Sequence, residues 1–138
     1  MLIRRELPGD QAAIRAVHSE AFRREAGVIP VEAPLVDELR AEGDLISALS
    51  LVAVREGAVV GHVCCSRARL GDDTAAAVGL GPLGEPAYYS RFGFVAAADL
   101  SITAPEPWWG RNFQARTLAA YEPTQAGAFE YAPAFSRI

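Results

Sequence analysis

The middle of the chain holds a close series of strand patterns joined by tight turns, and this series limits the possible folds most strongly. Leu49–Val54 has strand-like composition, and Glu56-Gly57 forms the short turn into a second strand, Val59–Ala68. Gly71-Asp72-Asp73 makes the next turn, into a strand from Thr74 to about Leu80. Turns this short join antiparallel neighbours, because parallel strands need a crossover connection. The sequence therefore predicts an antiparallel meander.

Two helical patterns and a short strand precede this meander. Leu2–Glu6 is expected to form the strand, and Asp10 to act as the N-cap of a helix that runs to about Glu25. A second helix is expected from near Pro34, in its first turn, to Gly43. The apolar stripe of the first helix follows the i, i+3, i+4, i+7, i+8 spacing and consists of Ile14, Val17, His18, Ala21 and Phe22.

The last third of the chain predicts a short helix followed by two further strand regions. The helix spans Pro86–Phe92 and ends at Gly93, and strand-like composition returns at Phe113–Leu118 and Phe129–Tyr131. We expect the Trp108-Trp109 pair between them to pack against the core or its rim, rather than to form a stacking platform. Helices at the front and strands throughout predict an α+β fold, and 138 residues suffice for a single domain, 1–138.

Composition excludes several classes of function. Thirteen basic against 17 acidic residues give a net charge of −4, so no basic face is available for nucleic acid. All basic residues are arginines, which excludes a lysine Schiff base and a P-loop lysine. The chain shows neither a signal sequence nor an apolar run of ~20 residues, so we expect no membrane association. Adjacent Cys64 and Cys65 are poorly placed to bridge each other, and reduced thiols predict a cytoplasmic protein.

Two local patterns resemble binding motifs, but their context does not support a site. Gly79–Gly84 matches G-x-G-x-x-G, but Pro82 removes an amide donor and the helix that follows is short, so we do not expect a dinucleotide site. His18 and His62 lie on different elements without metal-ligand spacing, so no metal site is predicted. His18 is interpreted either as a buried histidine bonded to a backbone carbonyl or as a site residue.

A longer pattern resembles the GNAT superfamily of N-acetyltransferases, in its uncharacterised bacterial branch. The segment EPAYYSRFGF (85–94) is similar to that family's short tyrosine helix with Tyr-x-x-x-Gly-Phe. LIRRELPGDQAAIRAVHSEAF (2–22) resembles its first strand and helix, VGLGPL (78–83) the start of its acetyl-CoA strand, and FQARTL (113–118) a late strand. The resemblance covers nearly the whole chain. It implies a GNAT-like fold with a mixed, mostly antiparallel sheet flanked by helices.

The resemblance also implies a reaction and site residues. A primary amine, on a small molecule or a peptide, would attack the thioester of acetyl-CoA, with Tyr89 protonating the leaving thiolate. Backbone groups of Leu80, Gly81 and Leu83 would bind acetyl-CoA, and an amide among them would polarise the carbonyl oxygen. The amine must lose a proton, and Glu32, His18 and His62 are unranked candidates for the base.

One departure from the family pattern affects these expectations. In the family a phosphate-binding loop, a long helix and a strand follow the GPL segment, whereas here Leu83 is followed directly by Gly84-Glu85-Pro86. An abbreviated fold without that loop predicts weak or absent binding of acetyl-CoA. It also leaves open a degenerate, non-catalytic binding or structural module, or a truncated sequence. Unpaired strand edges next to the uncharged Ala75–Leu80 predict a homodimer.

Overall fold

A computed structural model describes residues 1–81 and 86–138. The chain divides into two compact units, each described separately below. The first unit contains Met1–Arg67, Gly79–Pro82 and Ala132–Ile138, and the second contains Ala68–Val78 and Leu83–Tyr131. The single domain expected over residues 1–138 stays a prediction.

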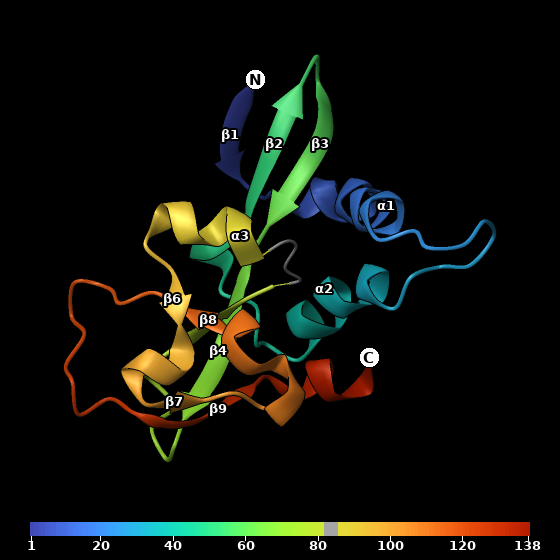
Figure 1. Cartoon of the computed structure of the whole chain (residues 1–138). Coiled ribbons are helices and arrows are strands. Elements are labelled where there is room, and N and C mark those ends of the chain that lie inside the picture. The colour runs from blue at the N-terminus through green and yellow to red at the C-terminus, as the bar shows by residue number, and fades with distance from the viewer. Residues whose placement is uncertain (82–85) are drawn as a thin grey trace. The chain divides into compact units, whose positions relative to one another are not determined.

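The first unit combines a three-stranded antiparallel sheet with two helices (Figure 1). The sheet has the order β1-β2-β3, as the hairpin pattern predicts. Its elements are β1 (Leu2–Arg5), α1 (Gln11–Ala21), α2 (Glu32–Ala41), β2 (Leu51–Arg55) and β3 (Ala58–Val63). Helix α1 packs against both β3 and α2. A short 3-10 turn, Ser47–Leu49, precedes β2, and another, Pro133–Arg137, lies near the C-terminus.

The core of the first unit lies where the helices meet the sheet. One buried cluster joins α1, α2, β2 and the end of β3 through Ile14, Val36, Val52 and Cys64. A shift in the β2–β3 register, between Ala53 and Val54, is a bulge that adds one residue to β3. As a result Val59 contacts this cluster while His62, three residues later, still has a fully buried side chain.

Both helices begin or end differently from the expectation. Helix α1 ends at Ala21 rather than near Glu25, and Asp10 does not cap it with its side chain. The Asp10 carboxylate instead accepts a 2.7 Å hydrogen bond from the Leu7 amide and pairs with Arg4. Helix α2 begins at Glu32, two residues before Pro34. Proline is tolerated there because the first four helical amides have no intrahelical partner.

Strand β4 (Cys65–Leu70) leads from the first unit into the second. It belongs to a four-stranded sheet of order β5-β4-β9-β7. Strand β9 (Gly127–Tyr131) is antiparallel to β4 and parallel to β7 (Ile102–Thr103). A small separate sheet pairs β6 (Val95–Ala96) with β8 (Gln114–Ala115). These mixed sheets and flanking helices confirm the predicted α+β class.

Two strand predictions need correction. The strand expected over Val59–Ala68 is interrupted at Cys64, so that β3 and β4 are separate strands. The strand expected over Thr74–Leu80 is reduced to β5 (Val78–Leu80). Asp73 explains the shortening, because its carboxylate accepts the Ala75 amide at 2.8 Å and holds the start of that segment in a turn.

A cluster of aromatic rings forms the interior of the second unit. Phe129 lies 5.4 Å from Phe113 and 4.8 Å from Tyr131, measured between ring centroids. Trp109 joins the cluster at 5.8 Å from Phe113, as predicted. Trp108 is 76% exposed, so the packing expected for this second tryptophan is wrong. Adjacent residues in the 3-10 turn Pro107–Asn112 point in different directions, and only one of the two indoles reaches the core.

The short tyrosine helix lies in the second unit. Helix α3 (Pro86–Tyr89) continues as a 3-10 turn, Ser90–Phe92, and ends at Gly93 with a φ of +82°. This left-handed conformation favours glycine, which confirms Gly93 as the end of the helix. No helix in the described part of the chain is long and apolar enough to span a membrane.

Candidate active site

The first unit buries a line of polar side chains beneath α1 and α2. Glu6 follows β1, and Ser50 precedes β2, where the Glu6 amide donates to the Ser50 carbonyl at 3.0 Å. His62 lies on β3, opposite Val52 in the register, and His18 lies on the inner face of α1. Sheet register and helix periodicity thus bring four polar residues from four places in the chain to one face of the sheet.

These four side chains form a continuous hydrogen-bonded chain. The Ser50 hydroxyl donates to Oε2 of Glu6, and Nε2 of His62 lies 2.9 Å from the Ser50 Oγ. Nδ1 of His62 in turn lies 2.9 Å from Nε2 of His18. The two imidazole rings meet edge to face, with an interplanar angle of 81°. The other ring nitrogen of His18, Nδ1, is buried without a hydrogen-bond partner among the described residues.

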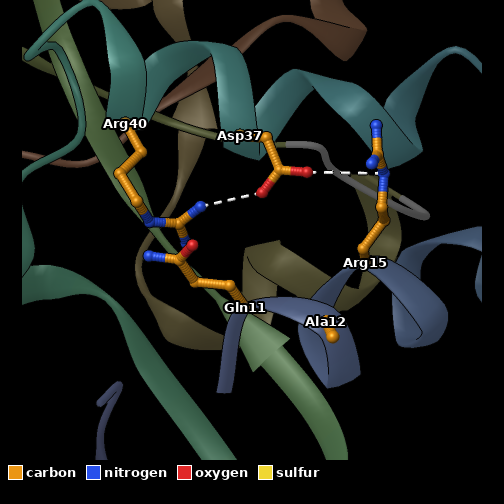
Figure 2. A pocket seen from close by; sticks show the side chains of 5 residues that line it. All are labelled: Gln11, Ala12, Arg15, Asp37 and Arg40. Carbon is orange, nitrogen blue, oxygen red and sulfur yellow. Dashed lines mark hydrogen bonds and ion pairs between the residues drawn. The ribbon is translucent and has the colours of Figure 1, made fainter. Parts of the chain in front are cut away.

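At its Glu6 end, the hydrogen-bonded series contacts Arg40, which also lines an open pocket. Glu6 Oε1 accepts from Arg40 Nη2 at 2.6 Å and from Arg40 Nε at 3.0 Å. Arg40 also donates to Asp37 at 2.9 Å, and Asp37 pairs with Arg15 at 3.4 Å. A pocket of about 400 Å³ lies between α1 and α2, and Figure 2 shows Arg15, Asp37 and Arg40 beside it. The lining residues are Gln11, Ala12, Arg15, Asp37 and Arg40.

Burial and hydrogen bonding set the protonation states of these four side chains. Burial alone would raise the pKa of Glu6, but hydrogen bonds from Ser50 and Arg40 outweigh it and lower that pKa. Burial, and then the neighbouring His62, lower the pKa of His18 to about 4. Burial also lowers the pKa of His62, against the opposing effect of Glu6. At neutral pH the site therefore holds one carboxylate and two neutral imidazoles.

Two of the three base candidates are thus brought together by the fold. His18 contacts His62, so the interpretation of His18 as bonded to a backbone carbonyl is wrong. Helical periodicity placed His18 on the inner face, but it could not show which group His18 would meet there. Glu32 is buried and pairs with Arg24 at 3.2 Å instead of joining the chain.

The residues predicted to bind acetyl-CoA lie partly in the described chain. Leu80 is half-buried at the end of β5, and Gly81 is buried just beyond it. The Gly81 amide donates to the Cys64 carbonyl at 3.5 Å, and the Cys64 thiol donates to the Gly81 carbonyl at 3.4 Å. Leu83 lies outside the described residues, and so does the second half of the G-x-G-x-x-G motif. The binding role of these residues stays a prediction.

Tyr89 lies in the second unit, on α3, and is half-buried. Its ring packs edge to face against Tyr88 at 5.2 Å and against Phe94 at 5.6 Å. Tyr88 is 54% exposed, so the two neighbouring tyrosines differ in environment. The assignment of Tyr89 as the acid stays a prediction. Because the two environments differ, a comparison of substitutions at Tyr89 and Tyr88 can test it.

The two cysteines are free, as predicted, and the described residues hold no cluster of three metal-ligating side chains. Burial raises the pKa of the Cys64 thiol to about 12, so Cys64 is not a thiolate nucleophile. Sequence reasoning missed Glu6, Ser50 and Arg40 as site residues. No local motif marks them, because their significance comes only from contacts across the sheet.

Comparison with known proteins gives the class to which this fold belongs. No family model and no curated protein matches the sequence. Among solved structures, the fold is that of acetyltransferases crystallised with CoA or acetyl-CoA. A GNAT family N-acetyltransferase (YhbS) from Escherichia coli, in complex with CoA, is 30% identical with a TM-score of 0.80, over 99% of this chain and 92% of that chain.

A GNAT family acetyltransferase from Brucella melitensis, in complex with acetyl-CoA, matches similarly. It is 30% identical with a TM-score of 0.72, over 97% of this chain and 97% of that chain. The chain belongs to the GNAT family of N-acetyltransferases. The resemblance that the sequence predicted is therefore confirmed.

Proposed function

We propose that this protein transfers the acetyl group of acetyl-CoA to a primary amine. The observation that carries the proposal is the match of almost the whole chain to two GNAT structures that hold CoA or acetyl-CoA. Acetyl-CoA is the co-substrate, and the acceptor is a small molecule or a peptide with a free amine. Tyr89 is the proposed acid for the departing thiolate, since a phenol is protonated at neutral pH.

The residues around β5 are the proposed binding site for the thioester of acetyl-CoA. Leu80 ends β5, and a backbone amide in this region is the proposed group that polarises the carbonyl oxygen. In the described residues, the helix that follows β5 is α3, which has only four residues. We therefore keep the prediction that acetyl-CoA binds weakly, because charge-assisted hydrogen bonds to its phosphates are reduced.

Calorimetric titration with acetyl-CoA, combined with an assay for released CoA thiol, tests both statements. We expect thiol release that depends on added amine, with a dissociation constant above the low-micromolar range. A low-micromolar constant would overturn the prediction of weak binding but not the proposed activity. The assay should use defined mixtures of amino acids, polyamines and lysine-containing peptides.

The second candidate is a GNAT-fold module that no longer catalyses transfer. The shortness of α3 favours it, because a helix of four residues offers few aligned amides to the phosphates of acetyl-CoA. Acetyl-CoA that neither binds nor reacts at millimolar concentration would support this candidate against the first. Comparing the intact mass with the sequenced gene would test whether the sequence is truncated.

Assembly and location complete the proposal. Strand β5 lies at one edge of the described four-stranded sheet, and an unpaired apolar edge can recruit a second copy. Strand β9 pairs with β4 rather than with the Ala75–Leu80 segment, so the C-terminal strand does not cover this edge. We propose a homodimer in the cytoplasm. Sedimentation equilibrium that finds a single species near 14.7 kDa would remove the dimer.

A further inference from the structure

The pocket between α1 and α2 is lined almost entirely by polar side chains. Helix α1 contributes Gln11, Ala12 and Arg15, and α2 contributes Asp37 and Arg40. Residues three or four apart lie on one side of a helix, so the polar residues of each helix share the side that lines the pocket. A volume of about 400 Å³ is typical of small-molecule sites, but Ala12 is the one apolar residue in this lining. The lining therefore suits a small ligand that is itself polar or charged.

Both arginines keep hydrogen-bond donors that the protein does not use. Arg40 donates to Glu6 through Nε and Nη2, and to Asp37 through Nη1. Two of its five N–H groups therefore have no acceptor among the described residues. Arg15 contacts Asp37 through Nε alone, at 3.4 Å, which leaves both of its Nη groups available to a ligand.

Arg40 is held in place before any ligand arrives. Its two hydrogen bonds to Glu6 fix the plane of the guanidinium, and Glu6 is held in turn by the Ser50 hydroxyl. The Arg40 side chain is 21% exposed, whereas that of Arg15 is 55% exposed. A donor that is already ordered loses little side-chain entropy on binding. The pocket thus offers one fixed guanidinium and one that is open to solvent.

The charges around the pocket alternate in sign. Figure 2 shows Asp37 between Arg15 and Arg40, with an interaction to each. Glu6 lies behind Arg40, so the four formal charges cancel. A simple anion would be attracted by the arginines but repelled by the two carboxylates, and a simple cation would meet the reverse. A ligand that carries both charges is complementary to this arrangement.

We propose that this pocket binds a free α-amino acid as its zwitterion. The ligand carboxylate accepts hydrogen bonds from the Nη groups of Arg15 and from an unused N–H of Arg40. The ligand ammonium donates to the Asp37 carboxylate. One carbon separates the two charged groups of an α-amino acid, which matches the direct contact between Asp37 and each arginine.

This ligand is not the amine that is acetylated. An amine attacks a thioester in its neutral form, whereas a carboxylate beside it, here that of Asp37, stabilises the ammonium form. The pocket is therefore a second ligand site. The inference is independent of the proposed function, because binding is measured without acetyl-CoA.

The two histidines of the chain provide a signal for occupancy of the pocket. Asp37 favours a positive charge on His18, and Arg40 opposes a positive charge on His62. A ligand that offsets the charges of Asp37 and Arg40 changes the electrostatic field at both rings. Glycine should therefore shift the histidine ring signals in nitrogen-15 NMR spectra of the wild-type protein.

Calorimetric titration of the wild-type protein tests the class of ligand. The probes are glycine, acetate, methylammonium and glycylglycine, whose charged groups lie farther apart. We expect glycine to bind saturably and more tightly than each of the other three. Absence of saturable glycine binding at millimolar concentration would overturn the proposal. Acetate, methylammonium or glycylglycine binding at least as tightly as glycine would overturn the assignment of an α-amino acid.

Substitutions then test the named contacts. Arg15→Gln should weaken glycine binding by about 10- to 100-fold, as expected for a lost charge-assisted hydrogen bond. Asp37→Asn keeps a side-chain oxygen for Arg40 but removes a negative charge, so it should weaken glycine binding and strengthen acetate binding. A merely structural defect would not reverse the preference in this way.

Arg23→Gln is the matched control for Arg15→Gln. Arg23 is similarly exposed, at 53%, and also pairs with a carboxylate, that of Glu20, but it does not line the pocket. Its substitution should leave glycine binding unchanged. An equal loss of affinity in the Arg15 and Arg23 variants, or an Asp37→Asn variant that still prefers glycine to acetate as the wild type does, would overturn the proposed contacts.

Discussion

The two units of this protein differ most in what they bury. The first unit encloses a polar chain of Glu6, Ser50, His62 and His18 beside a small aliphatic core. The second encloses aromatic rings around Phe129, and its described ion pairs, Arg69–Glu130 and Arg111–Asp99, lie at the surface. The first unit's interior is therefore sensitive to protons, whereas the second unit's stability depends on packing.

The largest expected effect concerns Tyr89, the proposed acid, which lies in the second unit. Tyr89→Phe should lower the rate of acetyl transfer by about 10²–10⁴, because the substitution removes the proposed acid. Tyr88→Phe is the matched control, since Tyr88 points about 100° away around the helix and is largely exposed. Steady-state thiol release compares the two. The assignment is wrong if the Tyr88 variant loses the rate and the Tyr89 variant keeps it.

Packing in the second unit should give the next largest effect. Phe129→Ala removes a buried ring from contact with Phe113 and Tyr131, and should lower the free energy of unfolding by about 3–5 kcal/mol. Trp108→Ala removes an exposed ring and should change it by less than about 0.5 kcal/mol. Urea unfolding followed by tryptophan fluorescence measures both. Equal effects would contradict the aromatic core.

Lowering the pH should reduce the stability of the first unit more than that of the second. The pKa of His18 lies at about 4 in the folded protein and near 6.5 in the unfolded chain, so the unfolded state binds more protons between these values. The contribution of His18 to stability is therefore intact above pH 6.5 and falls as the pH drops toward 4. We expect a loss on the order of 2 kcal/mol in the first unit.

The optical signals of the two units allow this difference to be seen. Both tryptophans lie in the second unit, whereas the long helices α1 and α2 lie in the first. Circular dichroism at 222 nm should therefore show a larger shift of the urea midpoint between pH 7 and pH 4.5 than tryptophan fluorescence does. His18→Leu should flatten the pH dependence of the helical signal. Identical shifts of both signals would show that the units do not respond separately.

The smallest expected effect comes from a second unsatisfied polar atom. Ser66, on β4, is buried, and its hydroxyl has no partner among the described residues. Ser66→Ala should leave stability unchanged or raise it by up to about 1 kcal/mol, because the hydroxyl no longer has to be desolvated. Ser50→Ala is the contrast, since its hydroxyl is bonded at both ends and its loss should destabilise the unit. Thermal unfolding compares the two variants.

Much of the local structure could be predicted from the sequence. The β2–β3 hairpin follows from its turn residues, the end of the tyrosine helix from Gly93, and the family from short motifs spread over the chain. The length of β5 could not be predicted. A hydrogen bond between the Asp73 side chain and the Ala75 backbone competes there with strand pairing. Composition alone does not reveal which of the two prevails.

The sequence by itself determined the two long helices, the β2–β3 hairpin, the α+β class and the candidate residues His18 and His62, because these depend on local turn chemistry and periodicity. Only the tertiary structure decided that these histidines meet, and that Ser50 and Glu6 extend them toward Arg40. His18 and His62 are 44 residues apart, and so are Glu6 and Ser50. Such contacts depend on the strand register, where a slip of one residue turns every side chain to the opposite face.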